Sequence, residues 1–173
     1  MTSEFAFRAQ LVTREQRQIY DYWRSCAAHR HMPARSDLDP FEMRQYLPDI
    51  CLIDILGGLP DAVVRLAGTR VRSVYGFELT GKCLGDLEWG EKDEYWRVVY
   101  RRLVEKGTPL QGAVQGPIAQ REHITLFWLR LPLSDNDESV NKILCYDFAV
   151  PNCASHRAVA ANEPANIKRA VNS

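Results

Sequence analysis

The sequence predicts an α+β fold in which five antiparallel strands form one sheet, with helices packed on one face and a helical extension at the N-terminus. Short apolar, partly β-branched runs occur in two groups, two before an amphipathic stretch and three after it. Glycine-rich or polar turns separate the runs. The 173 residues suffice for one domain with helical decoration.

The charge and the cysteine content argue against several classes of protein. The chain has 22 basic and 22 acidic residues, and this balance is unlike that of a nucleic-acid binder or a polybasic membrane clamp. Its five cysteines are widely spaced and lack a C-x-x-C pair, so neither a disulfide framework nor a structural zinc site is expected. No signal peptide and no membrane span is recognisable. We therefore expect a cytoplasmic protein with no nucleic-acid partner and no membrane insertion.

An amphipathic helix is predicted over residues 13–28. Thr13 and Gln16 have the spacing of a capping box at its start. Apolar residues recur behind them at helical spacing, and tyrosine and tryptophan are typical anchors of protein interfaces. The candidate interface residues of this helix are Ile19, Tyr22, Trp23 and Cys26. We expect a homodimer in which the helix packs on the sheet or on its mate.

A short helix is predicted over residues 39–46, after a linker over residues 29–38. Asp39 has the character of an N-cap, Pro40 suits the first helical position, and Glu42 suits the third. Pro48 then ends the helix. Residues 1–47 are therefore predicted to form the N-terminal helical extension.

Two strands, an irregular segment and a long helix are expected next, at residues 50–56, 62–67, 69–90 and 91–106. A glycine-rich loop suits a hairpin between the two strands. The helix has acidic residues at its start and basic residues at its end, which matches the helix dipole, and Gly107 suits its C-terminal cap.

Three further strands are expected at residues 110–118, 121–133 and 140–150. The last two are apolar on both faces, whereas a half-exposed antiparallel sheet would alternate apolar and polar residues. The outer face of the sheet is therefore expected to be covered, by the N-terminal helix or by a second subunit. This predicts a domain over residues 48–150 and a tail over residues 151–173, with a weak helix at 165–171.

The order of elements and several local motifs resemble a PAS sensor domain. The motifs are Leu66-Ala67-Gly68-Thr69-Arg70, the stretch Tyr75-Gly76-Phe77-Glu78-Leu79-Thr80-Gly81-Lys82, residues 32–40, and Leu47-Pro48-Asp49-Ile50. Together they are similar to standalone bacterial PAS proteins of the fifth PAS subfamily, over residues 18–150. The resemblance implies a non-enzymatic sensor or adaptor in signal transduction, often a homodimer, that acts on a protein signalling partner. It leaves the cofactor unknown, because PAS domains bind haem, flavins, carboxylates or no detectable ligand.

The same resemblance implies a ligand cavity between the sheet and the helices. Its candidate lining residues are Tyr75, Leu84, Leu87, Trp96 and Val99, with strand residues among Phe127, Leu129 and Cys145. The alternative is that these side chains fill a dry core.

Specific cofactor chemistries find little support in the sequence. Cys83 lies where light-sensing PAS relatives carry their flavin-reactive cysteine, but the asparagine, arginine and glutamine of their motif are missing, so a buried core cysteine is expected. The long helix contains no haem ligand. His29 and His31 are expected to be solvated linker residues, and no metal site is predicted.

Charged residues interrupt otherwise apolar strands at Asp54, Asp147, Arg65 and Arg130. A buried carboxylate is costly unless it is paired. These residues are therefore either cross-strand ion pairs or polar anchors within a ligand cavity. A rival hypothesis is a small cone-shaped α+β enzyme of the isomerase or dehydratase type, in which Asp147 and His123 would converge on one cavity as an acid and base pair.

Overall fold

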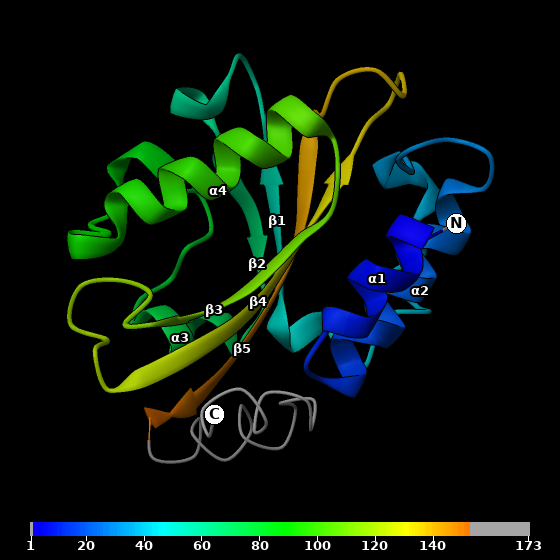
Figure 1. Cartoon of the computed structure of the whole chain (residues 1–173). Coiled ribbons are helices and arrows are strands. Elements are labelled where there is room, and N and C mark those ends of the chain that lie inside the picture. The colour runs from blue at the N-terminus through cyan, green and yellow to red at the C-terminus, as the bar shows by residue number, and fades with distance from the viewer. Residues whose placement is uncertain (1, 153–173) are drawn as a thin grey trace, which may run out of the picture.

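The computed structural model describes residues 2–152, with side chains from residue 4, and its centre is a five-stranded antiparallel sheet (Figure 1). The strand order is β2-β1-β5-β4-β3. The bounds of the strands are β1 Ile50–Asp54, β2 Val63–Ala67, β3 Leu110–Gln115, β4 Ile124–Leu133 and β5 Lys142–Pro151. This sheet, with helices beside it, confirms the predicted fold class.

The helices lie on both faces of this sheet, as Figure 1 shows. Their bounds are α1 Thr2–Gln10, α2 Arg14–Ala27, α3 Val71–Tyr75 and α4 Asp93–Lys106. Helices α3 and α4 lie on one face, and α1 and α2 cover the other. No helix in residues 2–152 is both long enough and apolar enough to cross a bilayer.

Helix α2 covers the outer face of the sheet, and its local structure follows from its sequence. The backbone N–H of Gln16 donates to Thr13 Oγ1 at 3.0 Å, and Gln16 Oε1 accepts from the N–H of Thr13 at 3.1 Å, which confirms the capping box. Trp23 is buried, and its Nε1 donates to the carbonyl oxygen of Pro132 on β4 at 2.9 Å. The chain's own helix therefore covers the second apolar face of β4.

The structure corrects the prediction in the N-terminal region. Helix α1 was not expected. Residues 39–46 do not form a helix but a run of turns, in which the N–H groups of Glu42, Arg44 and Tyr46 each donate to the carbonyl three residues earlier. The carboxylate of Asp39 accepts from the N–H of Phe41, and this bond favours a turn over a helix.

The strands are also shorter than predicted around the connection from β3 to β4. Gly116 and Gln120 have positive φ angles of 62° and 66°, so the backbone leaves the extended conformation there. Strand β3 ends at Gln115 and β4 begins at Ile124 for this reason. The helix predicted at 165–171 lies outside the described residues.

Asp54 ends β1 as a buried carboxylate that accepts bonds from two cations. Arg65 Nε lies 2.8 Å from Asp54 Oδ2, and Lys142 Nζ lies 2.7 Å from Oδ1. Burial alone would raise the pKa of Asp54, but Lys142 and Arg65 outweigh it and hold this pKa below its ordinary value. The predicted cross-strand pairing of Asp54 and Arg65 is confirmed.

We expect Asp54→Asn to lower the free energy of unfolding at neutral pH by about 1 kcal/mol. Because the folded-state pKa is lowered, the stabilisation is present above the ordinary pKa of 3.8 and is lost as the pH falls through the folded-state value. Urea unfolding of both proteins between about pH 7 and about pH 3 measures this difference. Glu88→Gln, at an exposed carboxylate, is the control. A difference that stays constant into acid would contradict the linkage.

Candidate functional site

A buried ion pair occupies the centre of the sheet on the face that carries α3 and α4. Arg130 on β4 and Asp147 on β5 are diagonal neighbours, because Trp128 is the strand partner of Asp147 and Cys145 is the partner of Arg130. Their exposed fractions are 1% and 2%, and Arg130 Nη1 lies 2.8 Å from Asp147 Oδ1. A charge so far from water persists only when it is paired and hydrogen-bonded.

Two tyrosines and a backbone carbonyl complete the hydrogen bonding of this pair. The hydroxyl of Tyr75 donates to Asp147 Oδ2 at 3.1 Å and accepts from Arg130 Nη2 at 3.3 Å. Arg130 Nε donates to the hydroxyl of Tyr100 at 3.3 Å, and Nη1 also donates to the carbonyl oxygen of Leu129 at 3.1 Å. Tyr75 belongs to α3 and Tyr100 to α4, so this network links both helices to the sheet.

Aromatic rings surround the guanidinium of Arg130. Its central carbon lies 5.3 Å from the ring centroid of Trp96, 5.7 Å from that of Trp128 and 5.9 Å from that of Tyr100. These distances are within the range of cation–π attraction, which is strongest when the cation is desolvated. We call Arg130, Asp147, Tyr75, Tyr100, Trp96 and Trp128 the buried arginine network.

Burial and charge act together on the titratable groups of this network. Burial would lower the pKa of Arg130, but the charge of Asp147 outweighs it, and the pKa of Arg130 is raised well above its ordinary value. Burial raises the pKa of Tyr75 well above its ordinary value, with the charge of Asp147 adding to the effect. Arg130 therefore stays charged and Tyr75 stays protonated at neutral pH.

Two free cysteines lie next to the network. Cys51 on β1 and Cys145 on β5 are buried strand partners. The hydrogen bond with Cys145, followed by burial, raises the pKa of Cys51 well above its ordinary value. Because the thiolate is the reactive form, Cys51 is a packing residue rather than a nucleophile.

A cavity of about 440 Å³ lies between α4 and two 3₁₀ turns, η3 (Leu59–Asp61) and η4 (Leu84–Asp86). We call it the α4 cavity. Its lining residues are Leu59, Pro60, Leu84, Gly85, Trp89, Asp93, Trp96, Arg97, Tyr100 and Arg101. Trp96 and Tyr100 also belong to the buried arginine network, so the cavity wall and the network share two rings. Its size and its aromatic lining are typical of small-molecule sites.

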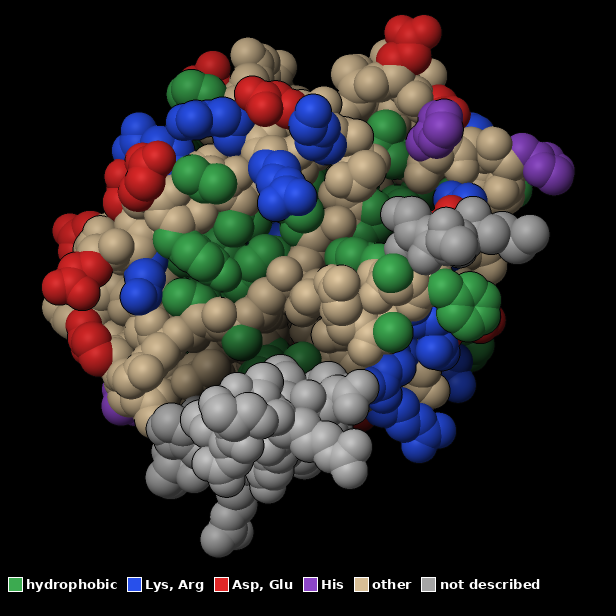
Figure 2. All heavy atoms as spheres, in the orientation of Figure 1, with side chains coloured by type: hydrophobic (Ala, Val, Ile, Leu, Met, Phe, Trp, Pro, Cys, Tyr) green, Lys and Arg blue, Asp and Glu red, His purple; other side chains and the backbone are tan. Residues whose placement is uncertain are grey.

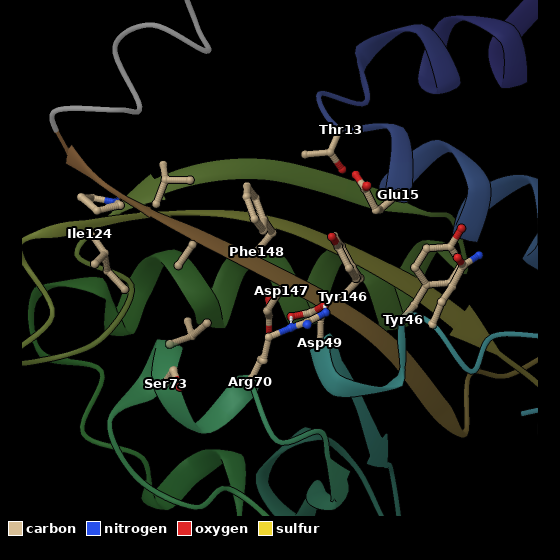
Figure 3. Close-up of a pocket in the computed structure, with 15 residues that line it drawn as sticks. Thr13, Glu15, Tyr46, Asp49, Arg70, Ser73, Ile124, Tyr146, Asp147 and Phe148 are labelled. Carbon is tan, nitrogen blue, oxygen red and sulfur yellow. Dashed lines mark hydrogen bonds and ion pairs between the residues drawn. The ribbon is translucent and has the colours of Figure 1, made fainter.

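A second cavity, of about 700 Å³, runs along β5 toward the N-terminal helices (Figure 3). Of its charged groups, Arg70, Asp49 and Asp147 already have partners within the chain, whereas Glu15 has none among the ion pairs of residues 4–152. Arg70 Nε lies 2.8 Å from Asp49 Oδ1, and Arg70 Nη2 also contacts Asp49 Oδ2. The hydroxyl of Tyr46 donates to Gln18 Oε1 at 2.6 Å, and Asp147 is held by Arg130. The larger cavity therefore offers few free polar groups, and we take the α4 cavity as the better candidate.

The predicted cavity residues have three different placements. Leu84 and Trp96 line the α4 cavity. Tyr75, Leu87, Val99 and Cys145 are buried but are not among its lining residues. Phe127 and Leu129 alternate along β4 with Trp128 and Arg130, so their side chains lie on the opposite face of the sheet, away from the α4 cavity.

The predictions missed Trp89 and Tyr100 as wall residues, and they named Arg130 as either a cross-strand ion-pair residue or a polar anchor of the cavity without assigning its partner. Trp89 Nε1 donates to the carbonyl of Leu84 at 3.1 Å, which holds its ring at the cavity. The signal for Arg130 was present, since a lone arginine in an apolar strand needs a buried partner. The pairing of Arg130 with Asp147 confirms the cross-strand hypothesis.

The interface residues and the rival catalytic pair are also placed by the structure. Ile19 and Trp23 are buried within the chain, while Tyr22 and Cys26 are half-buried. His123 is exposed in the turn before β4. The first residue of β4, Ile124, is four residues from the strand partner of Asp147, or about 14 Å along the strand. The chain therefore does not bring Asp147 and His123 together.

The sequence predicted Cys83 as a buried core cysteine, but its side chain is half-buried. It forms an isolated β-bridge with Val63, at the margin of the sheet. Its place is in the segment beside β2, and it is not among the residues that line the α4 cavity. The asparagine, arginine and glutamine of the light-sensing motif are missing around Cys83, and the buried arginine network lies on the face of β4 and β5 that carries α3 and α4.

Several solved structures share this fold at low sequence identity. The LOV protein of Rhodobacter sphaeroides is 18% identical, with a TM-score of 0.51, over 72% of this chain and 75% of that chain. The light-state structure of the blue-light photoreceptor Aureochrome1 LOV is 14% identical, with a TM-score of 0.50, over 69% of this chain and 94% of that chain. An RNA-binding Light-Oxygen-Voltage receptor has a TM-score of 0.53 at 14% identity, over 73% of this chain and 36% of that chain. At these identities the likeness shows the fold alone.

The family assignment comes from the sequence. No curated protein matches the chain. A family model described as PAS domain matches residues 12–146, well over half of the chain, and it includes most of the segment that we predicted as an extension. The antiparallel sheet, the helices α3 and α4 and the sequence match agree, and the chain belongs to the PAS domain family.

Proposed function

We propose that this chain is a non-enzymatic sensor or adaptor that binds a small ligand in the α4 cavity and signals through contact with a protein, a second copy included. The observation that carries the proposal is that Trp96 and Tyr100 serve both the cavity wall and the rings around Arg130. A ligand that moves these rings would act directly on β4 and β5. The PAS family assignment supports a sensory role.

The lining of the α4 cavity indicates which ligands would fit it. Trp89, Trp96 and Tyr100 provide flat apolar surfaces, and Arg97 and Arg101 place guanidinium groups at the rim. Arg97 is paired with Asp93 at 2.6 Å, whereas no ion pair to Arg101 occurs among residues 2–152. A planar molecule with an acidic group would therefore find both stacking surfaces and a charge partner.

The cytoplasm is the proposed location. The four cysteines in the described part of the chain are free, and two of them are buried strand partners. Free thiols at this density suit a reducing compartment.

The proposal is tested by filling the α4 cavity. Gly85 lines it, and a Cβ there would meet its nearest atom, the carbonyl oxygen of Pro60, at an ordinary 3.5 Å. Gly85→Phe should therefore fold and occupy the cavity. We expect native mass spectrometry to detect a co-purified small molecule on the wild type and at least a tenfold smaller fraction on Gly85→Phe.

Gly57→Phe is the matched control, because a Cβ at Gly57 also meets its nearest atom at 3.5 Å and Gly57 does not line the cavity. It should keep the bound mass. The fluorescent anion 8-anilinonaphthalene-1-sulfonate serves as a second probe, and it should bind the wild type and Gly57→Phe more tightly than Gly85→Phe. If neither a co-purified mass nor this anion distinguishes the variants, the ligand part of the proposal is wrong and the adaptor part remains.

A further inference from the structure

The two edge strands of the sheet, β2 and β3, differ in whether another segment of the chain covers them. At the β2 edge, the segment of residues 79–84 adds hydrogen bonds to the outer side of the strand. The N–H of Val64 donates to the carbonyl of Lys82 at 2.9 Å, and the N–H of Gly81 donates back to Val64 at 2.8 Å. This edge is therefore closed by the chain itself.

At the β3 edge, no such segment is present among residues 2–152. Gly116 continues the β3–β4 register opposite Ile124 and donates its N–H to the carbonyl of Ile124 at 2.9 Å. Because bonded and non-bonded pairs alternate in an antiparallel ladder, the N–H and C=O groups of Gln111, Ala113 and Gln115 point away from β4. Figure 1 looks onto this side of the sheet, with β3 in front and α4 beside it.

The sequence of β3 lacks the features that protect an edge strand. Its six residues, Leu-Gln-Gly-Ala-Val-Gln, include no charge and no proline. The neighbouring surface of α4 is apolar at its middle, where Val98 is 47% exposed and Tyr95 is half-buried. Figure 2 shows hydrophobic side chains gathered on this face, between basic side chains at the top and acidic side chains at the left.

The two ends of α4 carry net charges of opposite sign. Glu91 lines a shallow cavity with Gln115, so the start of α4 lies beside the end of β3. Arg102 lines a cavity with Leu110, so the end of α4 lies beside the start of β3. Apart from the residues that line the α4 cavity, the first end has three acids and one base, namely Glu91, Glu94 and Glu122 with Lys92. Counted in the same way, the second end has two bases and one acid, namely Arg102 and Lys106 with Glu105.

We propose that the β3 edge together with α4 is a homodimer interface, in which β3 pairs antiparallel with β3 of a second copy to give one continuous sheet. A twofold axis near Gly112 and Ala113 would place the acidic end of each α4 beside the basic end of its mate. A twofold interface needs a surface that complements itself, and an apolar middle between opposite charges has this property. At about 1.5 Å per helical residue and about 3.4 Å per strand residue, α4 and β3 are both about 20 Å long, so the two elements match in length. At the start of β3, the side chain of Gln111 donates to Gln10 Oε1 of α1 at 3.5 Å. This inference rests on the proposed signalling by protein contact, and it names the surface through which the contact is made.

The test begins with the mass in solution, measured by analytical ultracentrifugation. The wild type should have twice the chain mass of 19.8 kDa. Ala113→Pro removes an N–H that points away from β4, so the fold should persist while the strand pairing is lost. We expect Ala113→Pro to be monomeric and the matched control Ala113→Ser, which keeps the N–H, to be dimeric. Val98→Glu, at an exposed helix position, should also give a monomer. This variant replaces Ala113→Pro in the test if Ala113→Pro fails to fold.

Charge reversal tests the orientation. Glu91→Lys/Glu94→Lys and Arg102→Glu/Lys106→Glu should each be monomeric alone, because like charges then meet across the twofold axis, and neither variant changes a residue of the α4 cavity. Mixed in equal amounts, they should form a heterodimer. A monomeric wild type would overturn both this inference and the expected homodimer. A dimer that survives Ala113→Pro and Val98→Glu would overturn only this surface and leave signalling by protein contact in place.

Discussion

Replacing Arg130 by methionine should lower the free energy of unfolding by about 3–5 kcal/mol, because it leaves the carboxylate of Asp147 buried without its cation. The loss is large because the exposed fraction of Asp147 is 2%, so water cannot replace the guanidinium. Tyr75 would still donate to Asp147 Oδ2, but one neutral hydroxyl does not offset a buried charge. Urea unfolding followed by tryptophan fluorescence measures the change.

The double variant Arg130→Met/Asp147→Leu separates the pair from its surroundings. Removing both charges should recover most of the lost stability, since apolar replacements of buried ion pairs are often neutral or stabilising. Tyr75→Phe is a milder variant, expected to cost about 1 kcal/mol, and it stays measurable if Arg130→Met does not fold. If the double variant is no more stable than Arg130→Met, the cost comes from packing around the rings and not from the unpaired charge.

The second large effect is expected at Trp23, where alanine should also cost about 3–5 kcal/mol. Trp23 is buried between α2 and the sheet and stacks with Tyr20 at 6.0 Å between ring centroids. Its bond to the carbonyl of Pro132 is the direct link from the N-terminal helices to β4. Thermal unfolding should remain a single transition, because the N-terminal helices and the sheet share one core.

Phe5→Ala is the matched control for this prediction. Phe5 is also an aromatic residue of the N-terminal helices, but its side chain is 80% exposed. It should change the stability by less than about 0.5 kcal/mol. If Trp23→Ala instead gave two transitions, with the sheet unfolding at its original temperature, residues 1–47 would be a separate unit rather than part of the core.

The regular elements were predictable because their patterns are local. The capping box at Thr13 and Gln16, the dipole-matched charges of residues 91–106 and the glycine at position 107 each depend on neighbours in the sequence. Gly107 indeed has a φ of 60° and donates its N–H to the carbonyl of Leu103. The segment at 39–46 was misjudged because the same Asp39 that caps a helix also stabilises a turn.

The candidate site was predictable only in part, because it depends on strand register. Arg130 and Asp147 could be recognised as charges that need partners, but their diagonal contact follows from the pairing of Trp128 with Asp147. The face to which Phe127 and Leu129 belong is fixed by the same register. Both strands are apolar on their two faces, so hydrophobicity alone could not assign those residues to α1 and α2 or to α4.

One edge of the sheet is closed and the other is open, and this difference limits the size of any assembly that forms by strand pairing. A chain with two open edges could add further chains at both ends, which is the route to fibres. Here the hydrogen bonds that Val64 makes with Lys82 and Gly81 close the β2 edge, so β3 is the open edge of the sheet within residues 2–152. If two chains pair through β3, growth by strand addition stops at that pair, because the β2 edge of each chain is closed.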